Sequence, residues 1–158
     1  MDSNKPQIDV TEIFDTVEFP DAYKISYLAN AMIIPTYEDV FREFGLFRAE
    51  YHLLMCLAHY PVLAAHDVAR MTRMPRNTIS RAVKRMERDG FLTRAPDQED
   101  KRKARLTLTI EGRKIHDAVA AAFVQREAEL LDILSKRERE QFRETLAKLS
   151  VHASKLDR

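Results

Sequence analysis

Hydrophobic residues recur at helical spacing through the first third of the chain. The segment 22–34, AYKISYLANAMII, is predicted to form an α-helix, because its apolar residues lie three and four positions apart. We expect this helix to start near Pro20 or Asp21. Pro35 should kink or break it, since proline lacks an N–H and crowds the preceding turn. A further helical stretch, YEDVFREF, ends at Gly45, which suits a helix C-cap.

Three more helices are predicted between residues 47 and 90. The segment 47–59 is apolar around much of its circumference, which indicates a buried central helix that ends before Pro61. Residues 65–73, AHDVARMTR, form a short helix. A longer one then runs from Pro75 to Asp89, with Pro75 at its first position and Gly90 as its stop.

After Gly90 the pattern changes from helical spacing to alternation of apolar and polar residues. FLTRA and ARLTLT are predicted strands, and the eight residues PDQEDKRK between them are too many for a tight turn, so this tip should project. Thr109 suits the N-cap of a helix over 111–134, and Ser135 with Glu138 forms the capping box of a last helix. The prediction is a mainly α fold with a small β-hairpin.

Composition limits the class of protein. A chain of 158 residues with 45% apolar and 32% charged residues, three glycines and six prolines, fits one ordered, helix-rich domain. The longest apolar run, LLMCLA, is too short to cross a bilayer, and the start resembles no secretory signal. One cysteine forms no internal disulfide, so we expect a cytoplasmic protein without a membrane partner.

Charge is unevenly distributed. Residues 1–50 carry four basic and ten acidic residues, whereas residues 70–105 carry twelve basic and five acidic ones. This asymmetry predicts that the middle of the chain attracts a polyanion. A solvated charged face is the alternative.

The helix over 75–89 divides into two faces. Ile79, Ala82, Val83 and Met86 fall on one side, and cations with an amide fall on the other. A helix that rests on its domain and lies in a DNA major groove needs this division, although an ordinary amphipathic surface helix has it too. The candidate DNA-binding residues of this helix are Arg76, Asn77, Thr78, Ser80, Arg81, Lys84 and Arg88.

The basic hairpin directly after this helix favours the DNA-binding alternative. The short helix 65–73, the helix 75–89 and the hairpin resemble a winged helix-turn-helix, and the run TISRAVKRMERDGFLTRAPDQEDKRKARLTLTIEG (78–112) resembles the MarR family of transcriptional regulators. The family carries a D-x-x-D-x-R wing and an L-T-x-x-G helix start. The residues in those places here are Asp97, Asp100, Arg102, Leu108, Thr109 and Gly112.

The resemblance implies roles for the hairpin tip and an assembly. Arg102 would enter the minor groove with Asp100 fixing its side chain by an ion pair, and Lys101 and Lys103 would stand beside it. Pro75 departs from the family, which often has a serine cap there. The organisation implied is an N-terminal arm over 1–19 and one MarR-type domain over 20–158, with a DNA-binding lobe over about 47–110 and dimerisation helices over about 20–44 and 111–158.

Family members are two-fold dimers on pseudo-palindromic operators, and most are repressors. The last helix supports a homodimer independently, because a stripe spaced four and three residues apart suits pairing with another helix or packing within its own subunit. That stripe is Phe142, Leu146, Leu149, Ala153 and Leu156.

Many relatives respond to small aromatic or phenolic effectors in a cleft between the dimerisation helices and the DNA-binding lobe. The candidate lining residues here are Tyr23, Tyr27, Asn30, Arg48, His52 and His59. Arg48 and His52 lie four apart and could hold a carboxylate together, or could be surface or intersubunit contacts.

Other chemistries have little support in the sequence. Cys56 lies in the apolar run of the central helix, which favours an inert buried thiol over a redox sensor. The histidines have neither an H-x-x-x-H pair nor a cysteine partner, so we expect no metal or other cofactor. Phosphate-loop and nucleophile motifs of enzymes are absent. A winged-helix protein-interaction module remains an alternative, and a small cytosolic enzyme a weaker one.

Overall fold

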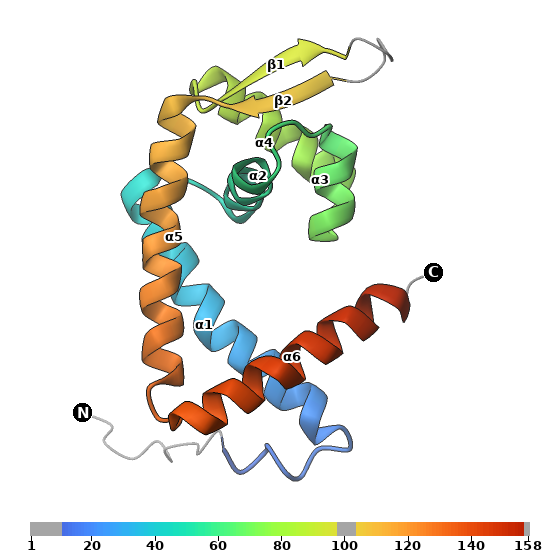
Figure 1. Cartoon of the computed structure of the whole chain (residues 1–158), viewed down its shortest axis with the longest axis vertical. Coiled ribbons are helices and arrows are strands. Elements are labelled where there is room, and N and C mark those ends of the chain that lie inside the picture. The colour runs from blue at the N-terminus through green and yellow to red at the C-terminus, as the bar shows by residue number, and fades with distance from the viewer. Residues whose placement is uncertain (1–10, 98–103, 157–158) are drawn as a thin grey trace, which may run out of the picture.

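The computed structural model describes residues 11–97 and 104–156. Its elements follow one another as α1 (Pro20–Phe44), α2 (Arg48–His59), α3 (Ala65–Thr72), α4 (Arg76–Arg88), β1 (Leu92–Pro96), β2 (Ala104–Leu108), α5 (Ile110–Leu131) and α6 (Lys136–Leu156). Figure 1 shows α2, α3, α4 and the hairpin gathered at one end, with α5 leading from there to α6 at the other end and α1 running back from α6 toward α2. The predicted class, mainly α with one β-hairpin, is confirmed.

The break predicted at Pro35 does not occur, because α1 is continuous across it. Proline cannot donate the backbone hydrogen bond to the carbonyl four residues earlier, which belongs to Ala31. The Arg126 guanidinium of α5 donates to that carbonyl instead, with an Nη2–O distance of 3.0 Å. The helix then ends as predicted at Gly45, whose φ of 65° is left-handed and whose N–H donates to the Phe41 carbonyl at 2.8 Å.

Local capping explains the starts of the last two helices. The Thr109 hydroxyl accepts a hydrogen bond from the Gly112 N–H at 3.0 Å, and the Glu138 carboxylate accepts one from the Ser135 N–H at 2.8 Å. Both predicted caps are therefore confirmed. Helix α5 ends at Leu131, earlier than the predicted residue 134.

The core lies between α2, α4, the hairpin and the first half of α5. Strands β1 and β2 pair antiparallel, with Leu92 opposite Leu108 and Arg94 opposite Leu106. The side chains of Leu92 on β1 and Leu106 on β2 are buried in the core. Leu106 also exchanges two backbone hydrogen bonds with Leu63, in the connection before α3. These contacts fix the two strands against the helices.

Candidate nucleic-acid interface

Helix α4 presents two chemically different faces. Ile79, Ala82, Val83 and Met86 are buried, as the sequence predicts. Arg76, Asn77, Ser80, Arg81, Lys84 and Arg88 are exposed, whereas Thr78 is half-buried. Since the apolar stripe holds the helix on its domain, the opposite row of cations faces outward and is available to a polyanion.

The start of α4 lacks a side-chain cap. The helix begins at Arg76, so Pro75 occupies the cap position and not the predicted first helical position. Its first turn contains no acidic residue, which leaves the positive end of the helix dipole beside the Arg76 guanidinium. The Asn77 side-chain oxygen accepts a hydrogen bond from the Thr78 N–H at 2.8 Å, which leaves the side-chain NH2 group of Asn77 as its donor for a base.

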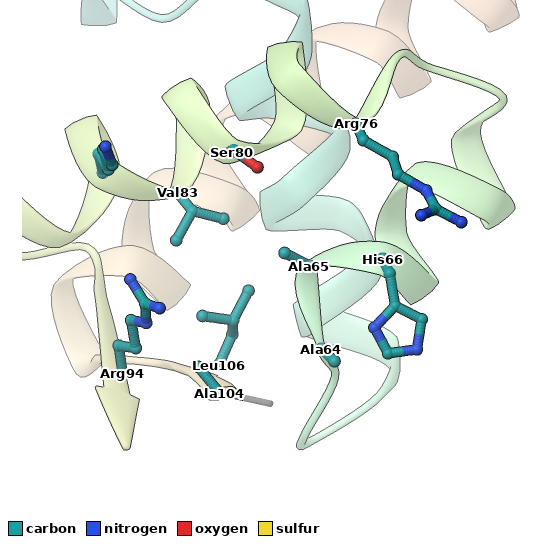
Figure 2. A pocket seen from close by; sticks show the side chains of 10 residues that line it. Ala64, Ala65, His66, Arg76, Ser80, Val83, Arg94, Ala104 and Leu106 are labelled. Atoms are coloured by element: carbon teal, nitrogen blue, oxygen red, sulfur yellow. The ribbon is translucent and has the colours of Figure 1, made fainter. Parts of the chain in front are cut away.

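A hollow of about 480 Å³ separates α3 and α4 from the hairpin strands. Its polar lining consists of His66, Arg76, Ser80, Lys84 and Arg94. Figure 2 shows Arg94 directed from β1 toward α4, whereas Arg76 and His66 lie at the opposite side of the hollow. Cations from a helix and from a strand therefore border one concave surface.

Arg94 lines this hollow, although the charge pattern of the sequence did not predict it as a site residue. Arg94 lies opposite Leu106 in the hairpin, so both side chains project from the same face of the sheet. Alternation from the buried Leu92 could have predicted this direction. What the alternation does not show is that Arg94 borders a hollow that it shares with residues of α3 and α4.

Two ion pairs flank the candidate interface. The Arg88 Nε lies 2.8 Å from an Asp89 carboxylate oxygen, and this hydrogen bond is the main reason why the pKa of Asp89 is below its ordinary value. Part of the Arg88 charge is thus already compensated. The Nε atom of Arg105, on β2, lies 4.0 Å from a carboxylate oxygen of Asp97, which directly follows β1. The predicted tip residues Asp100, Lys101, Arg102 and Lys103 lie outside the described residues.

The six candidate effector residues lie in several different environments, in which Tyr23 and Tyr27 share one and Arg48 and His52 share another. Tyr23 and Tyr27 pack around Phe14, with ring centroids 6.0 and 4.9 Å from it. His59 lies near the C-terminus of α2, 6.4 Å from the ring of His116. Asn30 is exposed on α1.

Arg48 and His52 belong to an aromatic cluster between α1, α2 and α5. His52 Nε2 lies 3.1 Å from the Tyr37 hydroxyl and 3.5 Å from Arg48 Nε. Tyr51 stacks on Phe123 with centroids 4.5 Å apart.

Burial sets the protonation states in this cluster. It lowers the pKa of His52, with the Arg48 charge adding to the effect, and it raises the pKa of Tyr37 and Tyr51. His52 Nδ1 is buried and has no hydrogen-bond partner among the described residues. His52 is therefore neutral near pH 7, and Arg48 is the cation of this cluster.

The remaining expectations concern Cys56, metals and membranes. Cys56 is buried, and burial raises the pKa of its thiol, which favours the protonated form. Within residues 11–97 and 104–156, no group of three or more potential metal ligands comes together. In the same part of the chain, every helix is too short or too polar to traverse a lipid bilayer.

The chain is similar in sequence to known transcriptional regulators. A family model described as the MarR family matches residues 44–103. The uncharacterised HTH-type transcriptional regulator YybA of Bacillus subtilis is 30% identical over 76 residues, which are 48% of this chain and 51% of that protein. The chain thus spans about half the length of this relative.

Two further similar proteins are a repressor and a protein solved in complex with DNA. The homoprotocatechuate degradative operon repressor of Escherichia coli is 27% identical over 61% of this chain and 66% of its own length. A crystal structure of an S. aureus MepR–DNA complex superposes with a TM-score of 0.72 and 25% identity, covering 85% of this chain and 99% of MepR. Its fold is therefore shared over nearly the whole described chain.

Proposed function

We propose that the chain is a winged helix-turn-helix transcriptional regulator of the MarR family, and not an enzyme, and that it binds double-stranded DNA; its similarity to the MarR family model over residues 44–103 supports this. The observation that carries the proposal is the exposure of Arg81 and Lys84 on α4 beside the cation-lined hollow under the hairpin. The DNA complex of the similar MepR supports it. Regulators of this kind act in the cytoplasm, where we place this protein.

In this proposal α4 lies in the major groove. Arg81 and Lys84 reach base edges there, since arginine and lysine bind the O6 and N7 atoms of guanine. Arg76 and Arg94 bind phosphates on either side of the hollow, because each presents a guanidinium to the concave surface that a DNA strand would cross. Arg102 enters the neighbouring minor groove, oriented by Asp100, and Lys101 and Lys103 add charge near it.

The protein acts as a homodimer in this proposal. Within the described residues α6 has no buried side chain. Leu149 is 50% exposed and Leu156 is 67% exposed. A groove of about 300 Å³ between α1, α5 and α6 is lined mostly by apolar residues, among them Ile25, Leu28 and Leu146. A second copy would cover this surface and place two α4 helices about 34 Å apart, matching a pseudo-palindromic operator.

The output we propose is repression relieved by a small aromatic or phenolic effector. The similar homoprotocatechuate degradative operon repressor of Escherichia coli supports repression as the output, and the operon that it represses acts on an aromatic compound. Arg48, next to Tyr37 and His52, is the candidate partner of an effector carboxylate. Calorimetry with a panel of aromatic carboxylates tests this: Arg48→Ala should abolish the binding seen with the wild type, and equal binding by both proteins would refute the role of Arg48.

The test of DNA binding uses a duplex that the wild-type protein selects from a random-sequence pool, and a scrambled duplex of equal composition. Arg102→Ala should weaken binding to both duplexes, because it removes a groove contact common to all sequences. Arg81→Ala should weaken binding to the selected duplex by about tenfold or more and relax the base preference. Affinity should also fall steeply with salt.

A protein-interaction module would behave differently in the same assay. Its binding to a partner would change little with salt, and it would select no duplex. If both arginine variants bind the two duplexes as the wild type does, the proposed roles of α4 and the hairpin tip are wrong.

A further inference from the structure

Arg85 is the cation of α4 that turns inward. Its Nη2 donates to the Gly45 carbonyl at 2.7 Å, and its Nε lies 3.4 Å from a Glu50 carboxylate oxygen. The guanidinium carbon sits 4.8 Å from the centre of the Phe47 ring, and Asp89 lies within 3.7 Å of Nε. Three of these four partners belong to the junction between α1 and α2, and only Asp89 adjoins α4 itself.

Glu50 makes this junction rigid. It is 3% exposed, and one of its carboxylate oxygens accepts the Phe47 N–H at 2.7 Å, which fixes the start of α2. The other oxygen faces Arg85. A buried carboxylate requires a partner charge, so Glu50 holds Arg85 in place as firmly as Arg85 neutralises Glu50.

Gly45 brings the end of α1 into the same group of contacts. Its left-handed backbone ends α1, and its carbonyl is the acceptor for Arg85. One guanidinium therefore contacts the end of α1 and the start of α2 while it belongs to α4. Arg81 and Lys84, the proposed base-reading residues, lie within the turn that precedes it.

We propose that Arg85 is a positioning residue that locks the DNA-reading face of α4 to the end of α1, so that a displacement of α1 is transmitted to α4. This inference rests on the proposed DNA binding. The apolar stripe alone lets a helix slide or rotate slightly on its support, whereas base contacts need placement within about 0.5 Å. A guanidinium fixed by a carbonyl, a buried carboxylate and a ring supplies that constraint.

The experiment separates positioning from stability by means of two variants. Arg85→Gln alone leaves Glu50 buried without its charge partner and should destabilise the fold. The double variant Glu50→Gln/Arg85→Gln has no unpaired buried charge, and glutamine can still accept the Phe47 N–H, so this protein should fold. Arg42→Gln is the control, because it removes one exposed charge near the end of α1 whose ion-pair partner is Asp39, on α1 itself.

Binding is measured with the selected and scrambled duplexes over a salt series. The double variant should bind the selected duplex about tenfold or more weakly than the wild type. It should bind the scrambled duplex with unchanged affinity and with an unchanged salt slope, since Arg85 contacts no phosphate. Arg42→Gln should keep the wild-type ratio between the two duplexes. A wild-type ratio in the double variant would overturn the proposal. So would a salt slope reduced by about 0.9, the value for one lost phosphate contact.

Hydrogen exchange without DNA tests the link itself. In the folded double variant, amides in the last turn of α1 and in α4 should both exchange faster than in the wild type. Faster exchange in α4 alone, or in neither helix, would mean that Arg85 does not couple them. If the wild type selects no duplex, the proposed function fails, but this exchange measurement still decides whether the coupling exists.

Discussion

At the scale of single residues, Arg126 explains why a proline is tolerated inside α1. The hydrogen bond that Pro35 cannot make is replaced by one from the Arg126 guanidinium to the Ala31 carbonyl, 95 residues away in the chain. Arg126 also lies 3.3 Å from Glu129, but both side chains are well exposed, so that ion pair contributes little. The carbonyl bond is therefore the important contact of Arg126.

We predict that Arg126→Met lowers the free energy of unfolding by about 1–2 kcal/mol, because it leaves the part-buried Ala31 carbonyl without a donor. In a Pro35→Ala background the loss should be much smaller, since alanine restores the helical N–H. Urea denaturation of the four proteins measures this coupling. Glu129→Gln, which removes only the ion pair, is the control. Equal effects of Arg126→Met in both backgrounds would show that Arg126 stabilises the protein in another way.

At the scale of elements, the hairpin and α5 depend on a close backbone approach. A Cβ atom on Gly112 would lie 2.0 Å from the Phe91 carbonyl oxygen, which is far inside contact distance. The Thr109 hydroxyl donates to the Gly90 carbonyl at 2.8 Å in the same place. In the L-T-x-x-G pattern, Thr109 thus caps α5 and also binds the backbone just before β1.

We predict that Gly112→Ala destabilises the protein by about 1–3 kcal/mol, because backbone must move to admit the methyl group. Thr109→Ala removes a cap and should cost about 1 kcal/mol. Chemical denaturation of both variants gives their order. Gly90→Ala is a useful comparison, since nothing lies within 4 Å of its Cβ position and only the positive φ of 79° opposes it. If Gly112→Ala is no more destabilising than Gly90→Ala, the close approach is not what requires glycine.

At the scale of the whole molecule, α6 is a long helix that a single subunit does not bury. None of its described residues is buried, although Phe142 and Leu146 line the groove against α1. An unpartnered apolar stripe of this size is unfavourable in water and typical of an interface. This surface supports the homodimer proposed above.

We predict that Leu149→Glu converts the proposed homodimer into monomers, because it places a charge on the exposed apolar stripe of α6. Ala147→Glu carries the same charge on the far side of α6 and should remain dimeric. Light scattering after size exclusion measures the mass. With the selected duplex, Leu149→Glu should also bind more than tenfold more weakly, since two half-sites are no longer engaged together. A wild-type monomer, or a Leu149→Glu dimer, would contradict this assembly.

Much of the fold could be predicted because it depends on local spacing. The apolar stripe of α4, the alternation of the hairpin and the caps at Thr109 and Ser135 each involve residues a few positions apart. The candidate site was predicted less fully. Arg85 lies at the edge of the apolar stripe, so helical spacing alone does not decide whether it points outward or inward.

The sequence by itself determined which residues share a face and where most helices begin and end, since these follow from contacts between near neighbours in the chain. Only the tertiary structure decided which distant group each side chain meets. Arg85 reaches a carbonyl 40 residues away, Arg126 one 95 residues away, and Arg94 borders a hollow formed with α3 and α4. The physical reason is that a guanidinium binds any carbonyl or carboxylate it reaches, so its partner is chosen by the packing of the elements and not by the pattern of the sequence.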